Sequence, residues 1–260
     1  MKRFENKVVI ITGASSGLGK DAAIRLAKEG ANLTLVGRNC ERLKETRKEI
    51  NDLNLGNETL IVIADVANED DVKKYVDKTV EKWGKIDGFL NNSGMEGKQN
   101  LTEDYGSDEF RRVVDVNLNG VFYGLKYVLK VMKKQNYGHI VNTASVGGIR
   151  GVGNQSGYSA SKHGVVGLTR NSAIEYGQFG ITVNAIAPGA IMTKMVEDSL
   201  RQMDPENPEK AGEAFVSVNP MKRFGKPEEV SGVIAFLLSD DANFVNGVVL
   251  PIDGGQSYKY

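Results

Sequence analysis

The 260-residue sequence predicts a single α/β domain built on a doubly wound parallel sheet. Short apolar runs recur along the chain and are mostly continuous rather than alternating, which is typical of strands buried on both faces. Between them lie amphipathic stretches with helical spacing. Alternation of this kind produces a parallel sheet with helices on both faces. No linker, repeat or low-complexity tract divides the chain, so we expect one domain over residues 1–260.

Seven apolar runs are the candidate strands. In chain order they are Val8–Ile11, Leu33–Val36, Leu60–Ile63, Phe89–Leu90, Ile140–Val141, Val183–Ile186 and Val248–Leu250. The candidate helices are Lys20–Glu29 and stretches near Asp70–Trp83, Phe110–Lys134, Tyr158–Tyr176 and Pro227–Ser239. The segment at about 191–225 combines prolines, methionines and scattered charges. We expect an irregular lid or substrate loop there, with an exposed variable loop as the alternative.

Composition argues against nucleic-acid and membrane partners. Lys plus Arg and Asp plus Glu both number 33, so the net charge is zero. No apolar stretch reaches the roughly 18 residues of a membrane helix, and the N-terminus lacks the features of a signal peptide. A single cysteine, Cys40, allows no internal disulfide, which agrees with a cytoplasmic protein. His139 and His163 lack metal-ligand spacing, so no metal site is expected.

A glycine-rich turn follows the first predicted strand and precedes a predicted helix. It reads Thr12-Gly13-Ala14-Ser15-Ser16-Gly17-Leu18-Gly19. Glycines allow a tight turn and a close approach of the backbone to a pyrophosphate, while the helix N-terminus offers free N–H groups and a positive dipole end. A glycine cluster alone indicates only a turn, but its position between a strand and a helix predicts a dinucleotide site.

Tyr158 and Lys162 are the strongest candidates for chemistry. Their spacing of four places them on one face of a helix, one turn apart. A neighbouring ammonium and the positive charge of an oxidised nicotinamide favour phenolate over phenol, so we expect the tyrosine pKa to fall. A pKa lowered by about 2–3 units would suit general acid–base catalysis. The same spacing on its own also occurs on ordinary helix surfaces.

Two further polar residues are candidates. Ser145 follows the predicted strand His139–Ala144, at the sheet edge where ligands bind in such folds. Its hydroxyl can hydrogen bond a substrate carbonyl, or simply cap the next segment. Asn117 lies within the predicted helix Phe110–Lys134, where a buried asparagine usually makes a structural hydrogen bond.

Together these motifs resemble the short-chain dehydrogenase/reductase family. Residues 12–19 match its T-G-x-x-x-G-x-G turn, Asn91-Asn92-Ser93-Gly94 is similar to its N-N-A-G, and Pro188-Gly189 matches its P-G. The resemblance implies a Rossmann-type fold and hydride transfer between a nicotinamide and a carbonyl or secondary alcohol. It also implies that Tyr158 moves the proton, Ser145 orients the substrate, Lys162 also bonds the nicotinamide ribose, and Asn117 holds a water in a proton relay.

The resemblance also implies a set of cofactor contacts. These are Gly13, Ser15, Ser16, Gly17, Leu18, Gly19, Arg38, Asp65, Val66, Asn91, Ser93, Gly94, Tyr158, Lys162, Pro188, Gly189, Ile191 and Thr193. NAD-preferring members carry an acidic residue at the end of the second strand, where this chain has Gly37 followed by Arg38. Because Arg38 can pair with a 2′-phosphate, we favour NADP(H) over NAD(H). The alternative is that Arg38 stacks on the adenine or faces solvent, which leaves NAD usable.

Within that family, residues 96–100, 142–158 and 251–257 resemble those of the levodione reductases, which act on a cyclic diketone. The expected substrate contacts are Ser145, Gly147, Val152, Gln155, Tyr158, Met192 and Met195. With Ile149 and Phe215 they make a largely apolar pocket, suited to a cyclic or hydrophobic ketone. The alternative is that these apolar residues only pack the loop. Levodione reductases carry an acidic residue at the end of the second strand, as NAD-preferring members do, whereas this chain has Gly37 and Arg38 there. Their cofactor preference therefore does not transfer directly to this chain.

Three alternative functions remain open, and the resemblance also implies an oligomeric state. A 3-oxoacyl carrier-protein reductase would place a basic patch at the pocket mouth, for which Lys98, Arg150 and Lys194 are available. A sugar dehydrogenase of the same family is also possible. A dinucleotide-binding regulator without turnover usually loses the tyrosine or the lysine, and this chain keeps both. Family members commonly assemble through the tyrosine-bearing helix and its neighbour, so we expect a homotetramer.

Overall fold

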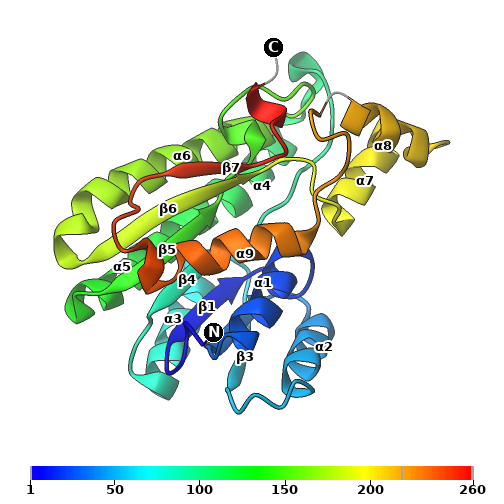
Figure 1. The fold of residues 1–260 in the computed structure, drawn as a ribbon. Coiled ribbons are helices and arrows are strands. Elements are labelled where there is room, and N and C mark those ends of the chain that lie inside the picture. Colours follow the sequence, from blue (N-terminus) through cyan, green and yellow to red (C-terminus); the bar gives the residue numbers. More distant parts are fainter. Residues whose placement is uncertain (1, 218, 259–260) are drawn as a thin grey trace.

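The computed structural model describes residues 2–217 and 219–258, which form one sheet of seven parallel strands. The strands are β1 Val8–Thr12, β2 Asn32–Gly37, β3 Thr59–Ile63, β4 Gly88–Asn91, β5 Gly138–Thr143, β6 Ile181–Pro188 and β7 Val249–Ile252. Their spatial order is β3-β2-β1-β4-β5-β6-β7, and every neighbouring pair is parallel. The predicted doubly wound sheet is therefore confirmed (Figure 1).

The helices cover both faces of the sheet. They are α1 Gly17–Lys28, α2 Cys40–Asn51, α3 Glu69–Trp83, α4 Ser107–Val114, α5 Gly120–Gln135, α6 Ser156–Tyr176, α7 Lys194–Met203, α8 Pro208–Ser217 and α9 Pro227–Leu237. On one face α1 packs between α2 and α9, and on the other α3, α5 and α6 lie side by side. Each face buries its own apolar cluster against the sheet.

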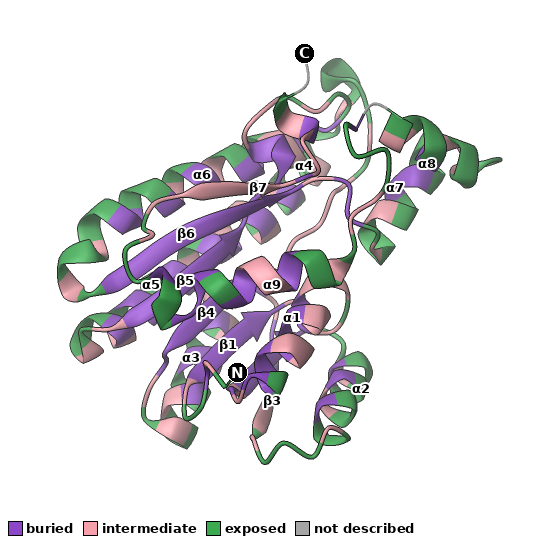
Figure 2. Cartoon of the chain, in the orientation of Figure 1, coloured by how far each residue is buried: buried purple, intermediate pink, exposed green. Residues whose placement is uncertain are grey.

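Burial follows from this layering. The central strands are buried along their whole length, which is why their apolar runs are continuous rather than alternating. The edge strands β3 and β7 are only partly buried. Figure 2 shows the contrast between the buried sheet and the exposed outer surfaces of the helices. Parallel strands joined by helices bring all of their carboxyl ends to one edge of the sheet, where ligands bind in such folds.

Polar caps define where several helices begin and end. The Asn68 side chain accepts hydrogen bonds from the backbone N–H groups of Asp70 and Asp71 at 3.0 and 3.2 Å, which starts α3. Gly84 ends the same helix with a φ of 74°, in the left-handed region that glycine tolerates best. Asn39 caps α2 in the same way, by accepting from the N–H of Arg42 at 3.0 Å.

The structure corrects four sequence-based expectations about helices. Helix α2 was not predicted, because only Leu43, Thr46 and Ile50 are buried in an otherwise charged segment. Helix α1 begins at Gly17 rather than Lys20, so the glycine-rich turn itself contributes its first turn. The predicted helix over 110–134 is interrupted by a π-helical turn at Asp115–Asn119. The segment 191–225 is not irregular, because α7 and α8 occupy most of it.

Two features of the 191–225 segment fix how it joins the sheet. Ile191 and Gly225 pair as a parallel β-bridge, so the chain leaves and re-enters the body at one point. The bridge is closed by backbone hydrogen bonds from Met192 N to Gly225 O at 3.0 Å and from Gly225 N to Ala190 O at 2.8 Å. Helices α7 and α8 pack on each other beyond this neck (Figure 1). In the described part of the chain, none of the helices is long and apolar enough to span a membrane.

Candidate active site

A cleft of about 520 Å³ lies at the carboxyl ends of the strands. Segments that follow β1 to β6 line it, together with the first turn of α7. Of the residues predicted from the sequence, it is lined by Gly13, Ser15, Ser16, Gly17, Leu18, Arg38, Asp65, Val66, Ser93, Gly94, Ser145, Tyr158, Lys162, Pro188, Gly189, Ile191, Thr193 and Met195. These residues come from distant parts of the chain, and the sheet topology brings them together.

The glycine-rich turn forms a cradle at the start of α1. Gly13 and Gly17 have φ values of 69° and 53°, which L side chains rarely adopt. The N-cap residue Ser16 makes no side-chain capping hydrogen bond, so the first N–H groups of the helix are left for another acceptor. A phosphate at this point would be held by those N–H groups and by the positive end of the helix dipole. The cradle therefore fits the pyrophosphate of a dinucleotide.

Gly19 has a different role within the same turn. A Cβ at this position would lie 2.3 Å from the carbonyl oxygen of Gly13, so only glycine allows α1 to pack this closely against the turn. Gly19 does not line the cleft among the described residues. Its contribution to the cofactor site is to shape the turn, which agrees with the close helix–strand packing expected of the third glycine.

Thr12 connects the cradle to the neighbouring strands. Its fully buried hydroxyl accepts hydrogen bonds from the N–H groups of Asn92 and Ser93 at 2.8 and 3.0 Å. The Asn92 side chain donates to the Thr12 carbonyl at 3.0 Å and accepts from the Thr143 hydroxyl at 3.2 Å. These bonds hold the ends of β1, β4 and β5 together at the edge of the sheet, next to the cleft.

Arg38 lies at the outer end of the cleft, after β2. Its Nη1 atom is 3.8 Å from Oδ2 of Asp65, and the two side chains are 73% and 41% exposed. An ion pair this exposed contributes little to stability, so the guanidinium is available to another anion. Arg42, from the first turn of α2, lines the same end. This region therefore combines two arginines with one carboxylate.

Tyr158 and Lys162 lie side by side on α6, as their spacing predicts. The Lys162 Nζ atom is 5.7 Å from the centre of the Tyr158 ring. The lysine is only 3% exposed and donates a 2.6 Å hydrogen bond to the carbonyl oxygen of Thr143, at the end of β5. Ser145, two residues further, hydrogen bonds to Tyr158 and also accepts from the N–H of Gly147 at 3.1 Å. The capping role that the sequence suggested for Ser145 is therefore present in the structure.

The pKa values of this pair differ from the expectation. Burial raises the pKa of Tyr158 to about 12, although the hydrogen bond from Ser145 favours the phenolate; a charge on Glu96 raises the value further. Burial also lowers the pKa of Lys162 to about 8. Desolvation of both groups outweighs the attraction that the sequence suggested between them. Without cofactor, Tyr158 therefore remains protonated at neutral pH.

Asn117 lies in the π-helical turn and is fully buried. Its side chain accepts from the N–H of Met95 and donates to the carbonyl of the same residue, both at 2.8 Å. It also donates to the Ser161 hydroxyl at 3.1 Å. The amide therefore fixes the segment after β4 against α6. Turns of this kind are frequent at functional sites because they displace a helix by one residue.

The expected substrate residues are only partly gathered at the cleft. Met195 lines it, and a Cβ on Gly147 would lie 3.3 Å from both Tyr158 and Val152, so these three residues are neighbours. Met192 is 38% exposed, and Gln155 is buried at the start of α6. Two suggested wall residues lie elsewhere. Ile149 packs in the apolar cluster under α6, and Phe215 stacks on Phe224 with ring centres 6.3 Å apart.

Asn91, predicted as a cofactor contact, is buried below the cleft and donates to the Val121 carbonyl at 3.0 Å. Its neighbour Asn92, which was not predicted, lines the cleft instead. The other unpredicted lining residues include Asn39, Arg42, Ala64, Met95, Val116, Thr143, Ala144 and Val196. Their signal in the sequence was weak, because each is an ordinary residue beside a motif. Within residues 2–217 and 219–258, no cluster of three or more His, Cys, Asp or Glu is suited to a metal.

Comparisons with known proteins agree with this geometry. The model of the family described as enoyl-(acyl carrier protein) reductase matches residues 13–257. Levodione reductase of Leifsonia aquatica is 58% identical over 258 residues, which cover 99% of this chain and 97% of that protein. The chain belongs to the short-chain dehydrogenase family. It is therefore an oxidoreductase that uses a nicotinamide dinucleotide to interconvert a carbonyl and an alcohol.

Other relatives share the same fold. A crystal structure of levodione reductase superposes with a TM-score of 0.98 and covers 99% of this chain and 100% of its own. Cyclohexanol dehydrogenase of Acinetobacter sp. (strain SE19) is 40% identical, with 99% of this chain and 97% of that protein covered. NAD⁺-bound xylitol dehydrogenase is 38% identical with a TM-score of 0.92, and 98% of this chain and 100% of that chain are covered.

The buried ammonium of Lys162 generates a prediction about stability. The pKa of Lys162 is lowered to about 8 in the folded protein and is about 10.5 when unfolded, so the folded protein binds fewer protons between these values. Burial of the charged lysine therefore lowers the free energy of unfolding by on the order of 3 kcal/mol below pH 8. This loss of stability disappears as the pH rises towards 10.5. Lys162→Met removes this loss.

Denaturant unfolding of the ligand-free protein at pH 7 and pH 10 measures this effect. We expect Lys162→Met to gain stability relative to the parent at pH 7, and the gain to shrink at pH 10. Lys74→Met, which replaces an exposed lysine on α3, serves as the control and should show no such change. A difference between Lys162→Met and the parent that is equal at both pH values would contradict the prediction.

Proposed function

We propose that this enzyme reduces, and in reverse oxidises, a cyclic or otherwise apolar ketone–alcohol pair, with Tyr158 as the proton donor and acceptor. One observation carries the proposal. The Tyr158 hydroxyl, hydrogen bonded to Ser145 and one helical turn from Lys162, lines the same cleft as the glycine cradle. Proton transfer at one end and dinucleotide binding at the other are the two requirements of carbonyl reduction.

The proton chemistry follows from the pKa of Tyr158. With a pKa of about 12 in the ligand-free protein, the phenol is protonated and can donate to the oxygen of a ketone. The Ser145 hydroxyl is placed to hydrogen bond the same oxygen as negative charge develops on it. In the reverse direction the phenolate takes the proton of the alcohol. An adjacent positive charge on the oxidised nicotinamide favours that phenolate.

The residues of the cradle would hold the dinucleotide, with Gly13, Ser15–Leu18 and Thr193 around the phosphates and Ser93, Gly94, Pro188, Gly189 and Ile191 along its length. Asp65 and Val66 would flank the adenine. When bound, the nicotinamide supplies or accepts the hydride. Lys162 would bond the nicotinamide ribose, and Asn117 would support a proton relay by holding the segment that follows β4. Asn91 and Gly19 would act by shaping the site rather than by contact.

The substrate class rests on the apolar side of the pocket and on the relatives. Val152 lies near Tyr158 across Gly147, and Met195 lines the same cleft, so both offer apolar surface to a substrate. We expect Met192 and Gln155 to complete that side. Levodione reductase and cyclohexanol dehydrogenase are named for cyclic ketones or alcohols. A sugar substrate would instead require several polar partners at this wall.

The carrier-protein alternative has less support. Such an enzyme needs free basic side chains at the pocket mouth to bind an acidic partner. Lys194 is paired with Asp198, and the Arg150 guanidinium donates to the Gln256 carbonyl at 3.2 Å. Of the three candidates, only the Lys98 side chain makes no ion pair and no hydrogen bond among the described residues. One lysine does not make a docking patch.

Turnover of cyclic ketones tests the proposed function. Absorbance at 340 nm, a property of the reduced nicotinamide, should fall when the enzyme meets substituted cyclohexanones. We expect Tyr158→Phe to lower kcat by about 10³-fold or more, since the proposed acid–base group is lost, while cofactor binding measured by fluorescence titration is retained. Near-normal turnover in that variant would refute the role of Tyr158. Activity confined to open-chain acyl thioesters would refute the substrate class.

We further propose that the enzyme prefers NADP(H). Gly37 places no carboxylate at the end of β2, and the exposed Arg38 and Arg42 are close to where a 2′-phosphate would lie. Asp65 is the opposing feature, because its carboxylate is 3.8 Å from Arg38 and competes for the guanidinium. A charge-assisted pair with phosphate is stronger than this long, exposed ion pair.

Exchange of the Arg38 charge tests the cofactor preference. We expect Arg38→Asp to raise the KM for NADPH by about 10–100-fold, because a phosphate contact is replaced by repulsion, and to change the KM for NADH by less than about threefold. Initial rates measured with NADPH and with NADH give the ratio of the two kcat/KM values. An unchanged ratio of the two kcat/KM values would show that Arg38 does not read the phosphate.

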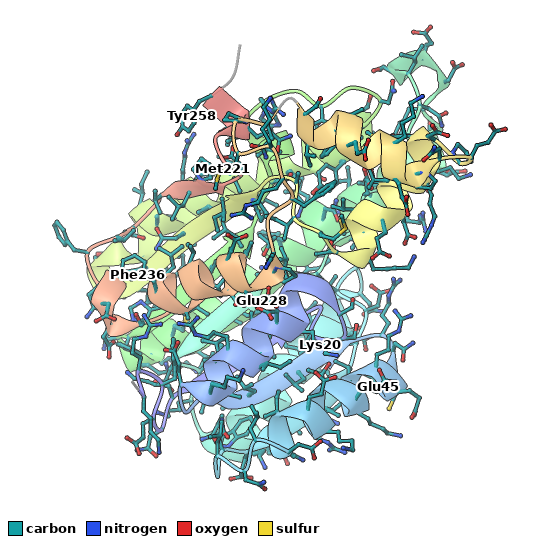
Figure 3. The ribbon with its side chains drawn as sticks, turned by 45° about the vertical axis from the view of Figure 1, so that its right-hand side comes forward. Lys20, Glu45, Met221, Glu228, Phe236 and Tyr258 are labelled. Carbon is teal, nitrogen blue, oxygen red and sulfur yellow. The ribbon has the colours of Figure 1, made fainter. Side chains whose placement is uncertain are left out.

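We also propose a homotetramer in the cytoplasm. Large apolar side chains remain exposed on the helices expected to assemble, with Phe110 and Phe122 at 38% and 46% and Ile174 of α6 at 84%. Met221 and Tyr258, exposed by 56% and 77%, lie at the end of the molecule that carries the C-terminal segment (Figure 3). Because the tail over residues 256–260 carries two tyrosines, we also expect it to pack across a subunit interface; residues 259–260 lie outside the described range.

Light scattering coupled to size exclusion tests the assembly. The expected mass is four times the chain mass of 28.3 kDa. Ile174→Asp should lower that mass, because a carboxylate placed in an apolar interface is not solvated. A parent protein that elutes with the mass of a single chain at micromolar concentration would contradict the proposal.

A further inference from the structure

Glu96 is a partly buried carboxylate in the segment after β4, and the mechanism above does not use it. It follows Met95, whose backbone is held on both sides by the buried amide of Asn117. The position of Glu96 is therefore fixed by the same asparagine that ties the segment after β4 to α6. Its hydrogen-bond partner Gln155 lies immediately before α6, three residues from Tyr158.

A single oxygen of Glu96 gathers three side-chain donors from different segments. Oε1 accepts from Ser199 Oγ of α7 at 2.8 Å, from Gln99 Nε2 at 3.2 Å, and from Gln155 Nε2 at a shorter distance. Gln99 also donates to Ser199 Oγ at 2.8 Å. Ser199 and Gln155 are only 8% and 7% exposed. These bonds form a closed network rather than solvent-exposed contacts.

The network joins the two sides of the cleft. Gln155 immediately precedes α6, three residues before Tyr158, whereas Ser199 lies one turn beyond the residues of α7 that line the cleft. The segment that carries α7 is also attached to the body at the Ile191–Gly225 neck and, beyond α8, by a hydrogen bond from Asn219 Nδ2 to the Asp253 carbonyl at 3.2 Å. A second, weaker tie runs from Gln99 N to Gln202 Oε1 at 3.3 Å. Glu96 is thus the central acceptor between α7 and the body.

We propose that Glu96 is a positioning residue that latches α7 over the substrate end of the cleft. Hydrogen bonds to an ionised acceptor are stronger than neutral ones, so the carboxylate holds Ser199 and Gln155 more firmly than an amide would. Without it, two buried donors lose their partner, and α7 opens about its neck. An open α7 leaves Met195 and Val196 farther from a ketone, so substrate binding weakens while the proton chemistry at Tyr158 is retained. This inference rests on the proposed function for its kinetic consequence alone.

Hydrogen exchange of the ligand-free full chain provides a test that needs no turnover. In Glu96→Ala we expect amide exchange over residues 194–203 to quicken by about tenfold, with the strands of the sheet unchanged. Glu96→Gln keeps an oxygen acceptor and should lie between the parent and Glu96→Ala. Ser199→Ala removes one donor with little change in size, so it provides a milder test should Glu96→Ala fold poorly. Glu197→Ala is the matched control, because this exposed glutamate of α7 lies outside the network.

Steady-state kinetics with a cyclic ketone completes the test. We expect Glu96→Ala to raise the ketone KM by about tenfold, equivalent to about 1.4 kcal/mol, with kcat lowered less than threefold and partial recovery in Glu96→Gln. Exchange over 194–203 that matches the parent would overturn the latch, as would faster exchange spread across the whole sheet. A fall in kcat at constant KM would also overturn it. Absence of ketone turnover in the parent would count against the proposed function and leave the exchange result to decide the latch.

Discussion

The buried hydroxyl of Thr12 joins the two halves of the sheet where their order reverses. Strands β2 and β3 extend from one side of β1, and β4 to β7 from the other, so the loops after β1 and β4 diverge at this point. Hydrogen bonds between Thr12 and Asn92 connect the two loops, and the Asn92 side chain also accepts from the Thr143 hydroxyl. The carbonyl of Thr143 then receives the Lys162 ammonium. The glycine cradle and the proposed proton donor are thereby held by one continuous set of hydrogen bonds.

Prediction from sequence succeeded where a residue pattern has a local physical cause. Central strands bury both faces and so appear as continuous apolar runs, and the glycines of residues 13–19 follow from backbone conformation. It failed where the cause is tertiary. Helix α2 shows three buried positions in a charged segment, and the π-helical turn at Asp115–Asn119 leaves no periodic signal. Asn92, Arg42 and Glu96 matter only because the fold brings distant segments together.

The environment of Tyr158 and Lys162 illustrates the cost of preparing a site for catalysis. Burial opposes ionisation of both groups, and the folded protein accommodates the lysine through only one hydrogen bond from Nζ, to Thr143, among the described residues. Apolar side chains of similar size at these two positions would make the folded protein more stable. What the arrangement achieves is a phenol and an ammonium held within one helical turn, ready to respond to charge that arrives with a cofactor and a substrate.

The neck at Ile191 and Gly225 has a consequence for how such enzymes diversify. Because the chain departs and returns at paired backbone positions, the intervening 33 residues leave the strand order of the sheet unaffected, although Thr193 lines the cleft and Asn219 donates to the Asp253 carbonyl at 3.2 Å. Substitutions in α7 beyond Thr193 can alter the wall of the pocket while the strands and the glycine cradle keep their sequence. Related enzymes can therefore acquire new substrates through changes in this segment, while the residues for hydride and proton transfer stay the same.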